Sequence, residues 1–387
     1  MRYALSLRAA ALAVTVAAAV GACVPLEDGP LMAKVQDHLD ALEAAGITGV
    51  LAEVDVDDER ALARSGRADT DGAAPVPWDA RFRMGSATKT FVAVVMLQLV
   101  AQGRVSLDDS VDTWLPGVVA GNGLDATRIT IRDLLQHTSG IYNYTIDFFS
   151  TITPERYAEH RLDHHEPVDL VAIATRHPPD FAPGAAWSYS NTNYVLAGMI
   201  IERATGRDWR DEVRARILAP LELRLTTDPG DDPDLPGPHA RGYEQFVDGG
   251  ALVDVTLQNQ TFADAAGSLV TTTDDLARFW RALRTGELLG PAEMAEMERT
   301  VLATPLQEVF PGLRYGLGVM AFPSRCGETL WTHFGDTLGY STRSAISGDG
   351  ARSIVVSLST NRAGEAALEV FAEEQRLLED VVCDGRD

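Results

Sequence analysis

The chain has 387 residues, of which 33 are basic and 56 are acidic, so its formal net charge is −23 at pH 7. Such a length suffices for one large domain or two closely packed ones with a sizeable apolar core. A strongly acidic balance argues against binding to nucleic acid and against adhesion to anionic lipid headgroups. The composition therefore indicates a globular protein whose partners are not polyanions.

The N-terminus has the pattern of an export signal, with Arg2 and Arg8 as the basic region and an apolar run over residues 9–20. The apolar run is too short to span a bilayer. We therefore expect a signal peptide over residues 1–22. The mature protein is then expected outside the cytoplasm, either secreted or anchored at the outer face of the cell membrane.

Cys23 follows the predicted processing site, at the position where a lipoprotein precursor carries its acylated cysteine. Two outcomes stay open at this point: lipidation of Cys23, or ordinary cleavage without a lipid. We expect residues 23–31 to form a short tether, so a lipid at Cys23 is the only membrane link that the sequence suggests.

Apolar periodicity predicts a helix over 32–45 and a pair of strands after it, and an amphipathic helix over 364–382 closes the chain. The predicted strands alternate with turns. The pair covers residues 49–56 and 60–64, and the remaining strands cover 315–322, 329–335, 340–346 and 353–358. Strands at both ends with a helical middle predict an α/β (α+β) fold, in which one antiparallel sheet is built from both chain ends and covered by helices. An all-helical lobe is expected as an insertion over roughly residues 104–264, within one catalytic domain over 32–387, and the cleft should lie between the two parts.

Ser86 and Lys89 stand three residues apart at the start of the apolar run 91–97, so on a helix they face the same way. Only Lys34 and Lys89 among the 33 basic residues are lysines, and unlike arginine a buried lysine can lose its proton. The pattern indicates a serine nucleophile beside a neutral amine. The alternative is an ordinary Ser-x-x-Lys on a surface helix.

Histidines add no second site. His137 lies near the end of a predicted helix, where a structural role is more common than direct chemistry. His160, His164 and His165 have no second ligand cluster of suitable spacing, so a solvated loop is expected and not a metal site.

Three short motifs follow one another along the chain: Ser86-Ala87-Thr88-Lys89, Tyr189-Ser190-Asn191 and His333-Phe334-Gly335. With them the chain resembles the serine β-lactamase and penicillin-binding protein superfamily. Within it, the chain resembles the branch of class C β-lactamases, D-alanyl-D-alanine carboxypeptidases and related esterases, and is most similar to secreted actinobacterial DD-carboxypeptidases. The resemblance implies a β-lactamase/transpeptidase-like fold and a reaction that needs no metal or cofactor.

The resemblance also implies roles for these residues. Ser86 would attack a carbonyl and form an acyl-enzyme, Lys89 would take its proton, and Tyr189 would relay it towards the leaving group. Asn191 would hydrogen-bond the substrate's amide, and His333 would set the electrostatics beside Tyr189. Phe334, Gly335 and Asp336 would line the substrate strand, with the backbone N–H groups of Ser86 and Asp336 forming the oxyanion hole.

Cys326 and Cys383 fall where the carboxypeptidase branch has a disulfide, and they form an even pair if Cys23 is lipidated.

The third motif departs from the family pattern, because Phe334 and Asp336 replace the usual threonines. Residues 320–322 (Met-Ala-Phe) occupy the stretch where relatives carry an arginine for the substrate carboxylate, and Phe262 replaces a larger aromatic residue. An aspartate about 4 Å from a substrate carboxylate costs several kcal/mol at an effective dielectric near 20. We therefore expect a weakened preference for free C-terminal carboxylates.

The sequence thus predicts a serine hydrolase of the cell envelope, related to D-alanyl-D-alanine carboxypeptidases and β-lactamases and monomeric. Its substrate would be a peptidoglycan-type peptide, a β-lactam, or a small ester or amide. The alternatives are an esterase or a D-aminopeptidase-like amidase on the same fold, or a non-hydrolytic penicillin-binding receptor.

Overall fold

The computed structural model describes residues 26–386. The predicted signal peptide, Cys23 and the first residues of the predicted tether lie outside the described residues. The rest of that tether is ordered: Leu26–Asp28 forms a 3-10 helix (η1), and Leu31 is buried in the first turn of α1. Within the described part of the chain, none of the helices has the length and apolar character that a membrane crossing needs.

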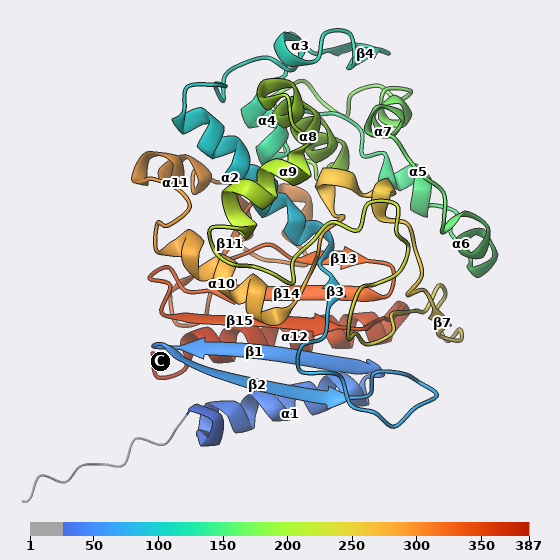
Figure 1. Ribbon diagram of the computed structural model, residues 1–387, viewed down its shortest axis with the longest axis vertical. Helices are drawn as coiled ribbons and strands as arrows, with labels where there is room; N and C mark the ends of the chain where they lie inside the picture. Colours follow the sequence, from blue (N-terminus) through green and yellow to red (C-terminus); the bar gives the residue numbers. More distant parts are fainter. Residues whose placement is uncertain (1–25, 387) are drawn as a thin grey trace, which may run out of the picture.

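Both ends of the chain contribute to one antiparallel sheet, as predicted (Figure 1). Its strands follow the order β2-β1-β15-β14-β12-β11-β10-β9, and β13 pairs with β14 beside this path. The N-terminal β1 pairs along its length with the C-terminal β15, so that Val50 lies opposite Leu358 and Val56 opposite Arg352. The strands of this sheet are β1 (Gly49–Val56), β2 (Glu59–Gly66), β9 (Val301–Leu302), β10 (Arg314–Tyr315), β11 (Met320–Pro323), β12 (Thr329–Thr332), β13 (Gly335–Thr337), β14 (Tyr340–Ile346) and β15 (Arg352–Leu358).

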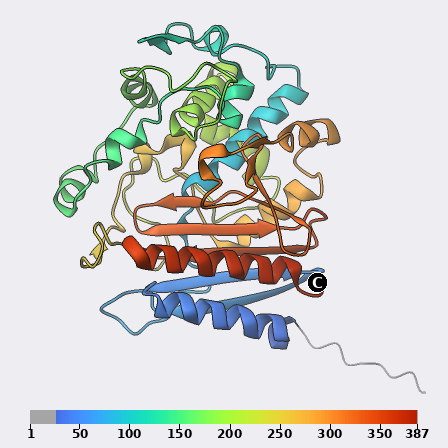
Figure 2. The ribbon, with the colours of Figure 1, turned by 180° about the vertical axis from the view of Figure 1, so that it is seen from behind.

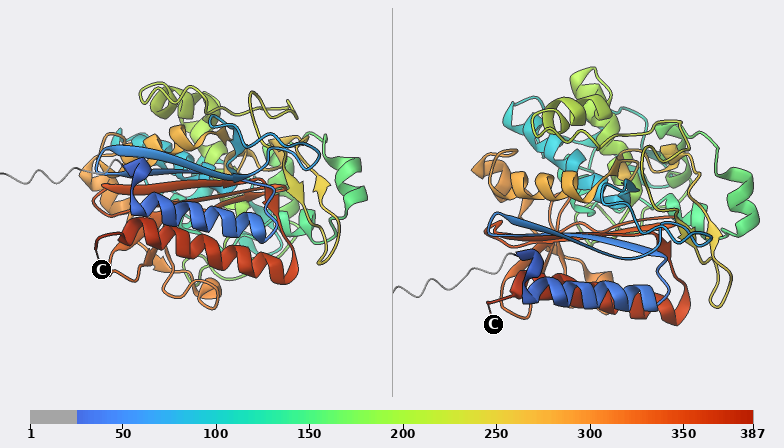
Figure 3. Two further views of the ribbon diagram at one scale, coloured as in Figure 1. Left: turned by 90° about the horizontal axis from the view of Figure 1, so that it is seen from below. Right: turned by 60° about the horizontal axis from the view of Figure 1, so that its bottom comes forward.

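Helices cover both faces of the sheet. Neighbouring residues of a strand point to opposite sides, so one strand contributes apolar side chains to both faces. On β15, Ile354 and Val356 pack into the core under α1 and α12, whereas Val355 joins the core under α10 and the helical lobe. Figures 2 and 3 show α1 and α12 side by side on one face of the sheet, with the remaining helices on the other. The helices are α1 (Pro30–Ala44), α2 (Thr88–Ala101), α3 (Val111–Trp114), α4 (Ile131–Gln136), α5 (Thr145–Phe149), α6 (Pro154–His160), α7 (Pro167–Ala174), α8 (Asn191–Thr205), α9 (Trp209–Val213), α10 (Thr273–Arg284), α11 (Pro291–Met297) and α12 (Gly364–Cys383).

The predicted inserted lobe is mainly helical and holds α3 to α9. The lobe was predicted to be all-helical, but it also contains strands of two residues each, which are too short for a sequence pattern to show. They are β4 (Ala120–Gly121), β5 (Leu124–Asp125), β6 (Tyr243–Glu244) and β7 (Val253–Asp254). β3 (Phe82–Arg83) pairs with β8 (Val270–Thr271), so the segments before and after the insertion lie together, and β6 of the lobe pairs with β16 (Thr360–Asn361).

Two predicted strands are divided in the structure. The strand expected over 315–322 breaks into β10 and β11 around Gly318, whose positive φ of 74° leaves the extended conformation. The strand expected over 329–335 ends at Thr332, and β13 begins at Gly335; both β12 and β13 pair with β14. The interruption places His333 and Phe334 between two strands and Gly335 at the start of the second.

The predicted disulfide is confirmed: Cys326, in the turn between β11 and β12, is bonded to Cys383 at the end of α12, with a Cα–Cα distance of 5.7 Å. The two cysteines are separated by 57 positions in sequence, and the bond ties the end of the C-terminal helix to the β11–β12 turn.

We predict that replacing both cysteines by serine lowers the free energy of unfolding by about 2–4 kcal/mol, because a closed loop of this length restricts the unfolded chain. Urea unfolding with and without reductant measures the effect. The wild type should lose this stability on reduction, and the double variant should not respond. Equal unfolding curves for the oxidised wild type and the variant would contradict the prediction.

Candidate active site

Lys89 lies in the first turn of α2, a helix in which all but three residues are buried, and its side chain is wholly inaccessible. Its Nζ lies 2.7 Å from Asn191 Oδ1, 2.6 Å from the carbonyl oxygen of Ala266 and 2.9 Å from Ser86 Oγ. Burial lowers the pKa of Lys89 well below its usual 10.5, because the charged form loses its hydration. The neutral amine is therefore the favoured form.

This geometry shows where the lone pair of a neutral Lys89 points. The oxygens of Asn191 and Ala266 can only accept, so they take the two N–H donors of the amine. The lone pair then faces Ser86, whose hydroxyl can donate to it. Ser86 itself lies in the 3-10 helix η2 (Gly85–Ala87), which runs directly into α2, and not in the α-helix as expected.

Tyr189 completes the predicted catalytic group. It is hydrogen-bonded to Ser86, and its ring centroid lies 4.9 Å from Lys89 Nζ. Burial raises the pKa of Tyr189 well above its usual 10, and the carboxylate of Asp336 adds to this, so the phenol stays protonated. A protonated hydroxyl bonded to Ser86 can accept one proton while it donates another.

His137 holds Tyr189 in place, a role that the sequence analysis did not identify. The N–H of Ser188 donates to the His137 carbonyl at 3.1 Å, and the N–H of Ser190 donates to His137 Nδ1 at 3.3 Å. The Nδ2 amide of Asn193 donates to the same Nδ1 at 3.0 Å, and the imidazole packs on Tyr189 with 4.3 Å between ring centroids. One residue therefore holds the peptide groups on both sides of the catalytic tyrosine.

His137 is wholly buried at the C-terminus of α4, with the left-handed φ of 63°. Because Nδ1 accepts hydrogen bonds, the ring proton is assigned to Nε2, an atom with no partner among the described residues. Burial lowers the pKa of His137 well below 6.5, with smaller contributions from Lys89 and His333. The imidazole is thus neutral and acts as an acceptor that positions Tyr189.

A cleft of about 320 Å³ opens between the helical lobe and β13. Of the predicted residues, Ser86, Asn191 and Asp336 line it. The remaining lining residues come from the lobe, the segment 262–267 and the strands, and are Gly85, Tyr144, Thr145, Phe149, Ile152, Glu244, Phe262, Ala263, Ala266, Gly267, Thr337, Leu338 and Asn361.

Two glycines allow the nucleophile segment to approach β13. A Cβ atom on Gly85, whose φ is 51°, would lie 2.8 Å from the backbone nitrogen of Asp336, and one on Gly335 would lie 1.9 Å from the carbonyl oxygen of Met84. Only glycine fits at either position. The backbones of Ser86 and Asp336 are therefore neighbours, as an oxyanion hole made from their N–H groups requires; that pairing stays a prediction.

Asn191 begins α8 and is held from three sides. Its Oδ1 accepts from Lys89, its Nδ2 donates to Thr145 Oγ1 at 3.0 Å, and its backbone N–H donates to Asn143 Oδ1 at 3.1 Å. A substrate amide would meet a side chain that is already oriented.

His333 and Phe334 lie away from the cleft. His333 is wholly buried, bonded to the Tyr315 hydroxyl at 2.8 Å and to the Phe334 carbonyl at 2.7 Å, and burial lowers its pKa to about 3. A neutral His333 near Tyr189 agrees with an electrostatic role. The expected contact of Phe334 with substrate is not supported, because its ring packs against Phe310 and Phe322 in the core under α1 and α12.

Two charged residues of the site were missed in the sequence. Arg343 on β14 bonds Asp336 Oδ1 at 2.9 Å and Glu374 Oε2 at 2.7 Å. Glu244 lines the cleft, and burial, with a further contribution from Asp336, raises its pKa above 4.5. The hairpin spacing between residues 336 and 343 was the available signal for Arg343, since Asp336 pairs with Ser341 and a diagonal neighbour lies two residues further on.

A family model described as "Beta-lactamase" matches residues 33–380, nearly the whole of the described chain. The chain belongs to this family. Ser86, Lys89 and Tyr189 all lie in the part of the chain that this family model matches.

Two curated relatives illustrate the range of the family. Penicillin-binding protein 4* of Bacillus subtilis is 27% identical over 277 residues, covering 69% of this chain and 58% of the relative. Esterase EstB of Burkholderia gladioli is 32% identical over 206 residues, covering 51% of this chain and 52% of the relative. The matches thus span little more than half the length of these curated relatives.

Solved structures match over nearly their whole length. A D-stereospecific amidohydrolase from Streptomyces sp. is 41% identical with a TM-score of 0.81, covering 88% of this chain and 98% of that one. D-amino acid amidase from Ochrobactrum anthropi SV3, complexed with L-phenylalanine amide, is 28% identical with a TM-score of 0.78, covering 91% and 99%. The predicted β-lactamase/transpeptidase-like fold is confirmed by these matches.

We predict that Lys89→Arg lowers kcat/KM by about 10²–10⁴-fold, because a guanidinium cannot lose the proton that general-base catalysis requires. In the wild type, kcat/KM should rise with pH as Lys89 loses its proton. Because the pKa of Lys89 is lowered, this rise should be complete well below pH 10.5. Ester hydrolysis followed across the pH range measures both effects.

Ser86→Ala provides the background rate for that experiment, and thermal unfolding shows whether Lys89→Arg is folded. Lys89→Met, which fits an apolar site, supplies a second variant without a base. Wild-type rates in either folded variant would remove Lys89 from its role.

We predict that His137→Leu lowers kcat by about tenfold or more with little change in KM, because the Ser190 N–H and the Asn193 amide lose their acceptor and Tyr189 loses its support. The free energy of unfolding should fall by about 1–3 kcal/mol, the cost of buried donors left unpaired. His137→Asn is the matched control, since asparagine tolerates positive φ and keeps an acceptor. Loss of stability without loss of kcat would show that His137 supports the fold alone.

Proposed function

We propose that this protein is an amidohydrolase or esterase that forms an acyl-enzyme at Ser86 and prefers substrates without a free C-terminal carboxylate. The observation that carries the proposal is the Asp336 carboxylate, which lines the cleft with 60% of its side chain exposed. A carboxylate at this point repels a second one and tolerates a neutral or cationic group.

The charges around Asp336 leave this preference in place. Arg343 is the guanidinium beside Asp336, but it is shared between Asp336 and the buried Glu374. The ion pair between Arg343 and Asp336 reduces the repulsion that Asp336 alone would exert on a substrate carboxylate. Glu244 also lines the cleft, so this region holds three carboxyl groups and one arginine, of which Asp336 and Glu374 pair with Arg343. A substrate carboxylate at about 4 Å from Asp336 would still experience a repulsion of order 1–4 kcal/mol, depending on solvent access.

An ammonium group next to the scissile carbonyl, as in an amino acid amide, suits this acidic wall. The D-amino acid amidase that matches over nearly its full length acts, by its name, on amides of D-amino acids, and the matching amidohydrolase is named as D-stereospecific. We infer an amino acid amide, or an ester of similar size, as the substrate class.

The proposed acylation needs only the residues described. Ser86 Oγ bonds to the carbonyl carbon as its proton passes to Lys89 Nζ, and the oxyanion points between the backbone N–H groups of Ser86 and Asp336. The proton moves from Lys89 through the Tyr189 hydroxyl to the leaving amine or alcohol, and the C–N or C–O bond breaks. Water then releases the acyl group by the reverse proton path.

A D-alanyl-D-alanine carboxypeptidase or β-lactamase activity is the second candidate. It is favoured by the Ser86, Lys89, Tyr189 and Asn191 arrangement and by the match to a penicillin-binding protein. A non-hydrolytic penicillin receptor would use the same acylation and differ only in slow release. We also propose an extracytoplasmic location, with or without a lipid on Cys23, which the disulfide between Cys326 and Cys383 supports.

We predict that the wild type hydrolyses an amino acid amide and a nitrophenyl acetate faster than a D-Ala-D-Ala peptide with a free carboxylate. Asp336→Thr should shift the ratio of kcat/KM towards the free acid by about tenfold or more, because one negative charge is removed and Arg343 loses a partner. Steady-state rates on the free-acid peptide and its C-terminal amide measure the ratio.

Asp336→Asn is the matched control, since it removes the charge at nearly constant volume. Mass spectrometry of the acyl-enzyme with penicillin, followed over time, separates stable labelling from turnover. A clear wild-type preference for the free-acid peptide would contradict the proposal and favour the carboxypeptidase.

A further inference from the structure

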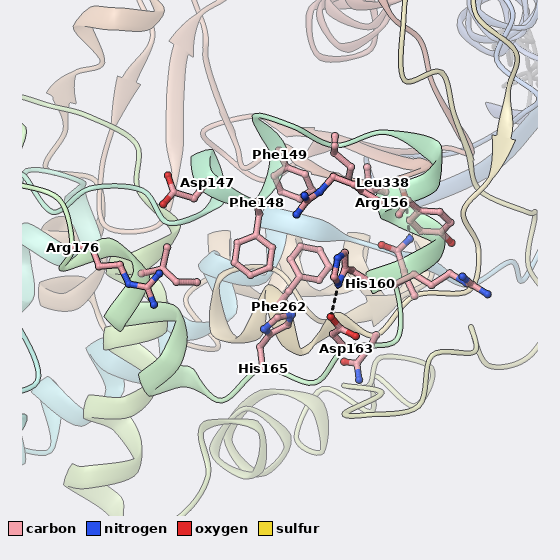
Figure 4. A pocket seen from close by; sticks show the side chains of 16 residues that line it. Asp147, Phe148, Phe149, Arg156, His160, Asp163, His165, Arg176, Phe262 and Leu338 are labelled. Atoms are coloured by element: carbon pink, nitrogen blue, oxygen red, sulfur yellow. Dashed lines mark hydrogen bonds and ion pairs between the residues drawn. The ribbon is translucent and has the colours of Figure 1, made fainter.

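A second cavity, of about 300 Å³, adjoins the catalytic cleft on the side of the helical lobe (Figure 4). Four residues line both cavities and are called the shared wall here: Phe149, Ile152, Phe262 and Leu338. The second cavity is therefore separated from Ser86 only by the catalytic cleft and this apolar wall.

The interior of the second cavity is mainly aromatic. Figure 4 shows Phe148, Phe149, Phe262 and His165 gathered around its middle. Ring centroids lie 5.9 Å apart between Phe149 and Phe262, 6.3 Å between Phe148 and Phe262, and 5.1 Å between Phe148 and His165. Half burial lowers the pKa of His165 below 6.5, which keeps this ring uncharged near neutral pH. Such a surface binds apolar and aromatic groups.

One buried polar atom in this cavity has no partner. Gln258 is 2% exposed, and its Nε2 donates to the carbonyls of Val255 at 2.8 Å and Leu338 at 3.0 Å. These two bonds fix the amide orientation, and Oε1 is left without a donor among the described residues. This oxygen is itself inaccessible, so Gln258 offers no hydrogen-bond acceptor to a ligand in the cavity.

The positive and negative charges that line the cavity nearly balance. The basic residues are Arg156, Arg161 and Arg176, and the acidic residues are Asp147 and Asp163. Asp163 is also bonded to His160 at 2.8 Å. Figure 4 shows Arg156 and Arg176 on opposite sides of the aromatic group. The cavity thus has no single sign of charge that would select an ion, and an uncharged ligand part fits it best.

We propose that this second cavity binds the distal, apolar or aromatic end of the acyl group that Ser86 takes up. The proposal rests on the proposed function, because it assigns the far part of the substrate whose carbonyl reacts at Ser86. It predicts that the enzyme favours acyl groups long enough to pass the shared wall.

Ile173→Trp tests the cavity without touching the catalytic cleft, because Ile173 on α7 lines only the second cavity. The matched control is Val168→Trp on the same helix, where Val168 is 50% exposed and lines neither cavity. If Ile173→Trp does not fold, Ile173→Phe makes the same test with a smaller side chain.

The first measurement compares p-nitrophenyl acetate with p-nitrophenyl octanoate. Ile173→Trp should lower kcat/KM for the octanoate by about tenfold, equivalent to roughly two methylenes kept out of an apolar site, and leave the acetate within about twofold. Val168→Trp should leave both unchanged. An equal loss on both esters, or no loss on the octanoate, would overturn the proposal.

The second measurement does not depend on catalysis. N-phenyl-1-naphthylamine, a neutral aromatic amine with one N–H, should bind Ser86→Ala with enhanced fluorescence and be displaced by octanoate ester. Adding Ile173→Trp should weaken its binding about tenfold or more, whereas binding that is unchanged by Ile173→Trp would overturn the proposal. If neither ester is hydrolysed but probe binding still depends on Ile173, the result supports the second cavity and contradicts the proposed function.

Discussion

The buried amine of Lys89 is the constraint on which this site depends. A helix that is apolar on nearly every side, α2, carries it into the core, where a charged form is costly and a neutral form finds two acceptors. Those acceptors come from distant segments: Asn191 opens α8 in the helical lobe, and Ala266 lies near the end of the segment that returns to the sheet. The lone pair left over faces Ser86. The lobe and the sheet region must therefore be assembled before the nucleophile is activated.

The same assembly supplies the electrostatic character of the cleft. Glycines at positions 85 and 335 let the nucleophile segment contact β13, and this contact brings Asp336 to the cleft. The β13–β14 hairpin then provides Arg343, which pairs with Asp336 but is also held by Glu374 from α12. We propose that the Asp336 carboxylate at this position disfavours a free carboxylate on the substrate.

The helical lobe contributes positioning as well as surface. His137 ends α4 in a left-handed conformation and fixes the peptides on both sides of Tyr189, while α5 and α6 form the aromatic cavity behind the shared wall. The support of Tyr189 and much of the second cavity are thus located in one lobe, and the charged strand β13 lies on the opposite side of the cleft. Substitutions in the second cavity can change the preferred acyl group while Ser86, Lys89 and Tyr189 stay in place.

The sequence by itself determined the local features. The runs between turn residues predicted β1 and β14 with the bounds that the structure has. The spacing of Ser86 and Lys89 predicted their contact, because backbone geometry sets which near neighbours face each other. It did not reveal the Asp336–Arg343 pair, the inward orientation of Phe334, the acidic Glu244 or the support of Tyr189 by His137. Each of these depends on where β13, β14, α4 and β6 pack in three dimensions. Residue type and spacing are local properties, whereas burial, pairing and cavity shape arise only when segments far apart in the chain meet.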